Sequence, residues 1–176
     1  MATLRVDDFK ARLSGGGARA NMFQVRIAAP AGITGIDMES LSFLVKGAQL
    51  PGSTVGIIDI PFRGRHFKMA GDRIFEPWTI TVLNDTDFRV RNMVESWMNR
   101  INQHESNVSS VDPSTYMVDM AVDQLDKNGE VLKTYEFKSA FPIQLTPIDL
   151  TWESENVIEE FQVTFEYLYW TSSTTT

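Results

Sequence analysis

Apolar and polar residues alternate along much of the chain, and this alternation predicts a mainly β protein. Trp78, Ile80 and Val82 alternate with threonines in a run of β-branched residues that is typical of a strand. The longest alternation runs from Ile158 to Trp170, and we interpret it as one continuous strand. Further strands are predicted at Met22–Ala28, Ser42–Lys46, Tyr116–Asp123, Val131–Lys138 and Phe141–Trp152, the last being bulged or at an edge because of Pro142 and Pro147.

The hydrophobic period changes near the middle of the chain, where apolar residues begin to recur at helical spacing. This predicts one amphipathic helix over about Thr86–Asn102, with Asp85 or Thr86 positioned to cap its first turn. A shorter helix is predicted at about Val6–Leu13, where a Ser-Gly-Gly-Gly run ends it. Because no internal repeat or linker is visible, residues 1–176 are expected to form a single domain. We expect an antiparallel β-sandwich or partial barrel with the longer helix packed against its side.

Residues 51–73 combine many apolar side chains with repeated glycine and proline. They read PGSTVGIIDIPFRGRHFKMAGDR. The alternation through Ile58, Ile60 and Phe62 predicts a hairpin with arginines near its tip, and a turn is predicted at residues 70–72. A long exposed apolar hairpin would promote aggregation of a monomer. We therefore expect this hairpin to dock on another protein, most simply on a second copy of the chain.

Composition narrows the classes of function. The 176 residues are 43% hydrophobic, which is typical of a chain that folds around a core. The formal net charge of −7 argues against tight binding to a nucleic-acid backbone, because such binding needs clustered Lys and Arg. The absence of cysteine excludes disulfides, thiolate zinc sites and thiol catalysis. No apolar run approaches the length of a membrane span and the charged start is unlike a signal peptide, so no membrane insertion is expected.

The sequence shows no pattern typical of an enzyme, and we predict no catalytic, cofactor-binding or metal-binding residues. His66 and His104 are the two histidines; we interpret both as polar surface residues, and no serine lies in a Gly-x-Ser-x-Gly context. No histidine or cysteine pair has metal-ligand spacing. Arg63 and Arg65 can grip an anion at the hairpin tip, although two arginines there are a weak signal. Aromatic side chains near the C-terminus can stack on sugars, although packing is the simpler explanation, and these are Trp152, Tyr167, Tyr169 and Trp170.

Five parts of the sequence resemble, in order, the tail tube protein of contractile-tailed bacteriophages. The most specific is the run A-G-D-R-x-F-x-x-W-T-x-T-V-x-N-D at Ala70–Asp85. The others are N-x-F-Q-V at Asn21–Val25, the segment Ala48–Pro51, the helix with its late Trp97, and W-x-x-x-N-x-I-x-x-F-x-V-T-F at Trp152–Phe165. Proteins of this family are β-sandwiches or partial barrels with a flanking helix. They form hexameric rings that stack into a hollow tube inside a sheath, and strands from six subunits combine into one inner β-barrel.

The resemblance implies roles for the hairpin and for three carboxylates. Residues 48–73 match the hairpin by which one ring reaches the next, and the side chains expected at that contact are Leu50, Ile57, Ile58, Ile60, Phe62, Arg63, Arg65, Phe67 and Met69. A neutral to acidic channel lets DNA pass without sticking, so Asp119, Asp123 and Glu136 are candidates for the lumen. Residues 171–176 are expected to be a flexible tail. The N-terminus and the loop Ala29–Glu39 look longer than is usual in the family.

The resemblance also implies partners and a location. The partners are other copies of the chain in stacked hexameric rings, the tail sheath protein, a baseplate or tube-initiator protein, and a tape-measure protein in the lumen. DNA passes through without specific binding, no cofactor is needed, and the protein is part of the virion tail after assembly in the host cytoplasm. Two alternatives stay open. One is the inner tube of a phage-like contractile injection system, and the other is a β-sandwich module that binds glycans.

Overall fold

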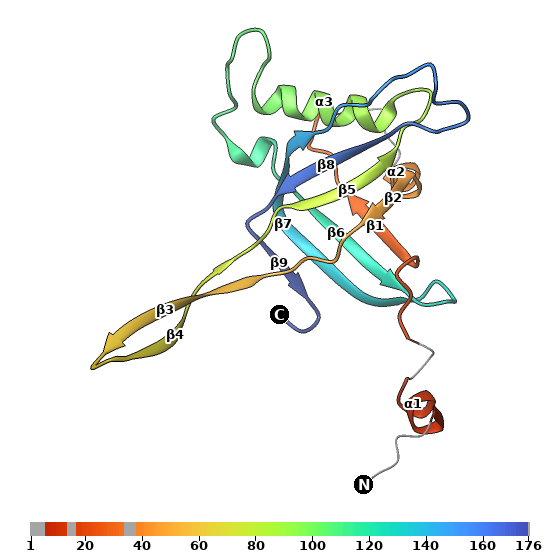
Figure 1. The fold of residues 1–176 in the computed structure, drawn as a ribbon. Helices are drawn as coiled ribbons and strands as arrows, with labels where there is room; N and C mark the ends of the chain where they lie inside the picture. Colours follow the sequence, from red (N-terminus) through yellow and green to blue (C-terminus); the bar gives the residue numbers. More distant parts are fainter. Residues whose placement is uncertain (1–5, 14–16, 34–37, 176) are drawn as a thin grey trace.

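The computed structural model describes residues 6–13, 17–33 and 38–175 (Figure 1). Its helices are α1 (Val6–Arg12), α2 (Met38–Leu44) and α3 (Arg89–Ile101), with a short 3-10 turn at Pro113–Thr115. Its strands are β1 (Phe23–Ile27), β2 (Val45–Ala48), β3 (Thr54–Phe62), β4 (Arg65–Ile74), β5 (Trp78–Leu83), β6 (Val118–Leu125), β7 (Val131–Leu145), β8 (Glu160–Glu166) and β9 (Tyr169–Ser172). The fold is mainly β, as the alternation predicts.

One long strand, β7, joins two antiparallel half-sheets. The first half of β7 pairs with β6 and β9, and β6 pairs in turn with β1. The second half of β7 pairs with β8, which continues to β5 and β2. Between the halves, Ser139 takes a left-handed backbone with φ 57°, and its amide donates to the carboxylate of Asp119 at 3.0 Å. This bulge lets one strand serve both half-sheets, so the predicted antiparallel sandwich or partial barrel is confirmed.

The inner faces of the two half-sheets enclose one hydrophobic core. Trp78 of β5 stacks on Phe137 of β7 with ring centroids 4.3 Å apart, which joins the half-sheets directly. Helix α3 closes the barrel with a buried stripe of Val90, Met93, Val94 and Trp97. The Trp97 indole donates to the carbonyl of Tyr116 at 2.8 Å. The predicted longer helix is confirmed but begins at Arg89, whose amide donates to the Asp85 carboxylate at 2.9 Å.

The predicted strand Ser42–Lys46 is wrong over its first half. Helix α2 continues to Leu44, and β2 begins only at Val45. The short apolar run at 41–45 fits either the two-residue period of a strand or the period of a helix. The helical period applies here: Leu41 and Val45, four residues apart, both enter the core, while Phe43 between them is exposed. The short helix predicted at the N-terminus is confirmed as α1.

The single strand predicted over Ile158–Trp170 is also wrong. Strand β8 ends at Glu166, and β9 begins at Tyr169 and pairs with β7 in the other half-sheet. Between them the buried Tyr167 donates its hydroxyl to the carbonyl of Glu76 at 2.8 Å. The alternation survives this crossing because both half-sheets face the same core. The expected tail 171–176 is shorter too, since its first two residues belong to β9.

Two further predicted boundaries are corrected. One strand, β7, replaces the two strands predicted at Val131–Lys138 and Phe141–Trp152, and it ends at Leu145. It continues past Pro142 because this proline lies at a register irregularity that the sheet tolerates. The turn predicted at residues 70–72 is a bulge inside β4, where three steps along β4 oppose two along β3.

Candidate assembly surfaces

The hairpin formed by β3 and β4 projects from the body as a two-stranded arm (Figure 1). Its two-residue turn consists of Arg63 and Gly64, with φ 45° and 82°. Two positive φ values match the twist of a tight hairpin, and glycine adopts them without strain. The register pairs Ile58 with Met69, Ile60 with Phe67 and Phe62 with Arg65, so the strands stay in contact to the tip.

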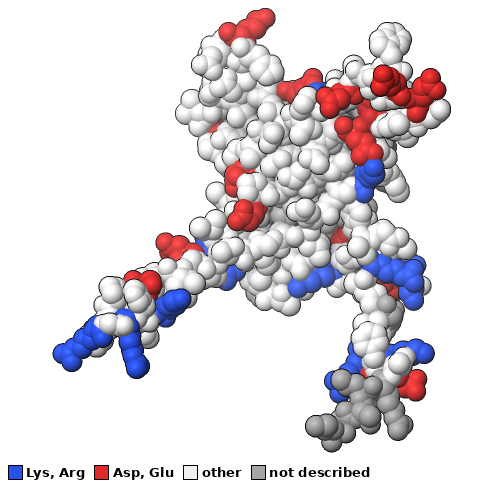
Figure 2. Space-filling view, in the orientation of Figure 1, with Lys and Arg blue, Asp and Glu red and all other residues white. Residues whose placement is uncertain are grey.

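One face of this arm is apolar and exposed. Opposed residues of an antiparallel pair project to the same face. We define the apolar hairpin face as Ile58, Ile60, Phe62, Phe67 and Met69, whose side chains keep 42% to 67% of their surface exposed. Within the described residues, no carboxylate lies within ion-pair distance of Arg63 or Arg65, and Figure 2 shows cations at the far end of the arm. The arm therefore offers an apolar, basic-tipped surface.

The opposite face of the arm is mixed. Asp59 opposes Lys68, and its carboxylate lies 3.1 Å from the imidazole Nδ1 of His66. Ile57, predicted as a contact residue, lies on this face opposite Ala70 and is exposed. Leu50, also predicted, is exposed in the segment that precedes β3.

The root of the arm is closely packed, which explains part of its glycine content. A Cβ on Gly71 would lie 3.2 Å from the Ile58 side chain and 3.3 Å from the backbone of Gly56. Two indoles hold the segment between β2 and β3: Trp170 donates to the carbonyl of Gly52 at 3.0 Å and Trp78 to that of Gln49 at 2.7 Å. The arm is therefore fixed to the core at its base.

The three predicted lumen carboxylates share the outer face of the half-sheet β1-β6-β7-β9. Asp123 is only 4% exposed, because Arg26 Nε donates to its Oδ2 at 2.8 Å and the Thr134 hydroxyl to its Oδ1 at 2.5 Å. Asp119 and Glu136 lie nearer solvent, and each has a carboxylate oxygen 2.9 Å from Lys138 Nζ. The structure thus brings all three candidates together and pairs each with a cation.

These ion pairs fix the charge of the face near neutral pH. Burial alone would raise the pKa of Asp119, but hydrogen bonds from Lys138 and from the Ser139 amide outweigh it and lower that pKa. Hydrogen bonds to Asp119 and then to Glu136 raise the pKa of Lys138. Three carboxylates thus meet two cations. The sequence did not reveal Arg26 and Lys138 as partners, because only the strand register brings them beside the acids.

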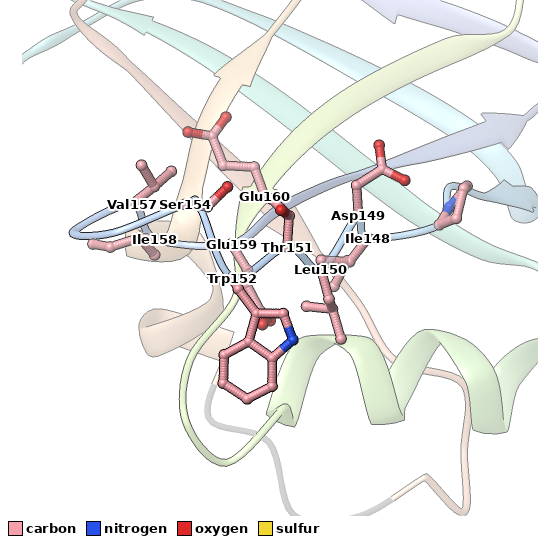
Figure 3. Close-up of a pocket in the computed structure, with 11 residues that line it drawn as sticks. Ile148, Asp149, Leu150, Thr151, Trp152, Ser154, Val157, Ile158, Glu159 and Glu160 are labelled. Carbon is pink, nitrogen blue, oxygen red and sulfur yellow. The ribbon is translucent and has the colours of Figure 1, made fainter.

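A second exposed surface is the acidic loop, which we define as residues 147–160. It lines a cavity of about 650 Å³ (Figure 3). Trp152 and Leu150 are almost fully exposed on it. The loop contains no Lys or Arg, and its carboxylates are Asp149, Glu153, Glu155, Glu159 and Glu160. Acidic side chains gather on this side of the molecule, away from the basic tip of the hairpin arm (Figure 2).

Two features are absent from the described residues, a metal-ligating cluster and a membrane-spanning helix. No three acidic or histidine side chains among them gather closely enough to hold a metal ion. No helix in the described ranges is both long and apolar enough to cross a bilayer. Of the C-terminal aromatic residues, Tyr167 is buried and Trp170 packs edge-on against Tyr135 with ring centroids 5.4 Å apart, whereas Tyr169 is about half exposed and Trp152 is fully exposed in the acidic loop.

Comparison with known proteins identifies the family. The phage tail tube protein family matches residues 18–173. The chain is 32% identical over 167 residues to the tail tube protein gp19 of Enterobacteria phage T4, covering 94% of this chain and 98% of that protein. It is 31% identical over 170 residues to the tail tube protein of Serratia phage KSP90, with 95% of each covered. One chain of the extended sheath–tube complex of an extracellular contractile injection system, PVC, shares the fold with a TM-score of 0.60. The two chains are 16% identical, and the match covers 97% of this chain and 99% of the other. The chain therefore belongs to the phage tail tube protein family.

Proposed function

We propose that the protein forms hexameric rings that stack into the inner tube of a contractile phage tail, through which DNA is ejected. The observation that carries this proposal is the exposed apolar hairpin face on a member of the tail tube family. A free monomer gains nothing from such a face, whereas a stack of rings buries it between copies. In this role the protein is structural and performs no catalysis.

The hairpin arm supplies the contact between successive rings. Complete burial of one Ile or Phe side chain contributes about 1.5–3 kcal/mol. The five side chains of the apolar hairpin face are about half exposed, so their burial contributes several kcal/mol per arm. Six arms per ring multiply this contribution, because one ring docks as a unit on the next. Arg63 and Arg65 then lie at the tip, where they can meet acidic groups of the neighbouring ring.

The outer face of β1-β6-β7-β9 lines the channel. Its carboxylates and cations are paired, so the lining exposes neither a strong basic patch that would bind phosphate nor a large negative field. DNA then passes without specific binding, and a tape-measure protein occupies the same channel during assembly in the host cytoplasm. Closure of the sheet into a ring also removes its free edges.

The side that carries α3 and the acidic loop faces outward, toward a surrounding sheath protein, with a baseplate or tube-initiator protein at one end. A chain of a sheath–tube complex shares this fold, which supports a role beside a sheath by analogy. The tube of a phage-like injection system would have the same architecture. Its neighbouring genes would lack those for a capsid and terminase, and this distinguishes the two.

Negative-stain electron microscopy across a concentration series tests the proposal. We expect rings with a central hole at moderate concentration and tubes built from them at high concentration. Sedimentation analysis of the same samples gives the number of subunits in a ring. A protein that stays monomeric at every concentration, and that does not extend a tube from purified baseplates, would overturn the proposal.

A further inference from the structure

The N-terminal helix α1 forms a second arm whose apolar side chains stay exposed (Figure 1). None of its residues is buried. Val6, Phe9 and Leu13 are 43% to 69% exposed, and the Leu13 amide donates to the Phe9 carbonyl at 3.0 Å, which extends the helical hydrogen bonding. Residues spaced three and four apart share one side of a helix, so these three side chains form an apolar stripe.

This stripe needs an external surface to stabilise it. Isolated helices shorter than about 12–15 residues are marginal in water, and most helices are stabilised by packing an amphipathic face. Helix α1 has seven residues and none of them is buried. A Cβ on Gly17 would lie 3.8 Å from the Leu13 side chain, and within the described residues Val6 and Phe9 stay largely exposed. The stripe therefore suits an apolar surface on another molecule.

The apolar hairpin face fits this requirement in size and chemistry. The stripe from Val6 to Leu13 extends about 10 Å at a helical rise of about 1.5 Å per residue. The hairpin face from Ile58 to Phe62 extends about 13 Å at about 3.3 Å per residue. Both surfaces are exposed and lack a partner among the described residues. Packing one against the other would cover both.

The placement of the two arms makes this contact one between copies. Figure 1 shows α1 and the hairpin leaving the body in different directions and lying far apart, so they do not meet within one chain. Both arms lie on the side of the body that carries β9, whereas the acidic loop lies beyond, beside α3. A shift of one copy along a stack brings the hairpin of one ring toward α1 of the next.

We propose that α1 packs its Val6–Phe9–Leu13 stripe on the apolar hairpin face of a copy in the adjacent ring. This inference rests on the proposed stacking of rings, and it adds the surface that receives the hairpin arm, namely α1 of the adjacent ring. The contact is heterologous, since two different surfaces meet, and such contacts repeat without closing along a stack.

The absence of cysteine in the chain allows a direct cross-linking test. One protein carries Phe9→Cys and another carries Phe67→Cys, and the two are mixed, assembled into tubes and treated with a short bismaleimide. We expect a heterodimer on denaturing gels from tubes and none from isolated rings. Ala11→Cys replaces Phe9→Cys as the matched control, because it lies on the other side of α1. The proposal would be overturned if no heterodimer forms, or if isolated rings give the same yield as tubes. Efficient cross-linking of Phe9→Cys to Trp152→Cys instead of Phe67→Cys would also overturn it.

A second variant tests the energetic consequence. Phe9→Asp should raise the protein concentration needed for tubes by at least about tenfold, because it removes a large apolar side chain from the contact. Ala11→Asp is the control and should change it little. Circular dichroism should stay unchanged for both, since α1 contributes no buried residue. If wild-type protein forms no rings or tubes, the proposed function fails. If Phe9→Asp tubes form as readily as wild type, only the role of α1 fails.

Discussion

Asp123 illustrates how a residue on an outward face becomes part of the interior. Its neighbours along the sheet, Arg26 and Thr134, cover its carboxylate and satisfy both oxygens. The spacing of Asp123 along β6 suggests an exposed acid like Asp119. The two aspartates differ in the side chains that the adjacent strands place beside them. The sequence therefore identifies the acidic face but not which of its charges is covered.

Replacing this covered carboxylate should weaken the fold. Asp123→Ala leaves the Thr134 hydroxyl without its acceptor and removes the partner of Arg26, so we expect the free energy of unfolding to fall by about 1–3 kcal/mol. Glu136→Ala on the same face is more exposed and should change it by about 0.5 kcal/mol or less. Urea titration followed by tryptophan fluorescence measures both. Equal losses for the two variants would show that burial of Asp123 is not what matters.

A single substitution on the arm should separate folding from assembly. Ile60→Asp places a charge in the middle of the apolar hairpin face, where it would be buried only between rings. We expect an unchanged circular dichroism spectrum and no stacking of rings in electron micrographs. Val108→Asp, at an exposed valine outside the arm, is the control and should stack normally. Unfolding of Ile60→Asp would instead place this side chain in the core of the subunit.

At the level of elements, the hairpin arm depends on its root. The bulge in β4 brings Gly71 against Gly56, and the indoles of Trp78 and Trp170 hold the segment that leads into β3. Two of the glycines that seem to contradict a strand are thus explained by a close backbone approach. In the proposed stack, a fixed root would direct the arm toward its neighbour and reduce the entropy lost on docking.

Gly71→Ala should test this root. The added Cβ would lie 3.2 Å from the Ile58 side chain and 3.3 Å from the Gly56 backbone, so the two strands must shift locally, and we expect a cost of about 1 kcal/mol. We expect a redirected or loosened arm, a normally folded body, and weaker stacking, measured as a higher concentration for tube formation. Gly52→Ala is the matched control, because a Cβ there meets nothing within 4 Å. Equal stacking of both variants would count against a tightly packed root.

The elements also show where sequence reasoning succeeds and where it stops. Strand β5 and helix α3 are predictable, because each buries one face at a regular period. The crossing from β8 to β9 is not, because both half-sheets face one core and the alternation continues through Tyr167. The hairpin arm is predictable as an exposed apolar surface. Its root and the ion pairs of Lys138 are not, since strand register determines them.

At the scale of the whole molecule, charge is divided between surfaces. The acidic loop accounts for much of the net negative charge, while the outer face of β1-β6-β7-β9 is almost balanced by its ion pairs. In the proposed tube this puts the strongest negative field on the outside and a nearly neutral wall on the inside. Such a wall limits both attraction and repulsion of a passing polyanion.

Reversing one charge on that wall should make the tube retain DNA. Glu136→Lys adds two positive charges per subunit relative to wild type, repeated around each ring. We expect wild-type tubes to release duplex DNA at about 0.15 M salt, and Glu136→Lys tubes to hold it until the salt is raised. Glu155→Lys in the acidic loop changes the charge equally and should not trap DNA inside. If Glu136→Lys tubes form normally and retain none, Glu136 does not face the channel.

The arm leaves the body on one side only, and this makes a stack of such rings directional. One terminus of the filament ends in protruding hairpins, while the other ends in a surface that receives them. Subunits joining at the two termini therefore bury different groups and need not add at the same rate. A protein that starts the filament and a protein that ends it must accordingly present unlike surfaces, one complementary to the arms and one that imitates them. In the proposed tube, unequal growth at the two termini would then follow from the asymmetry of one subunit.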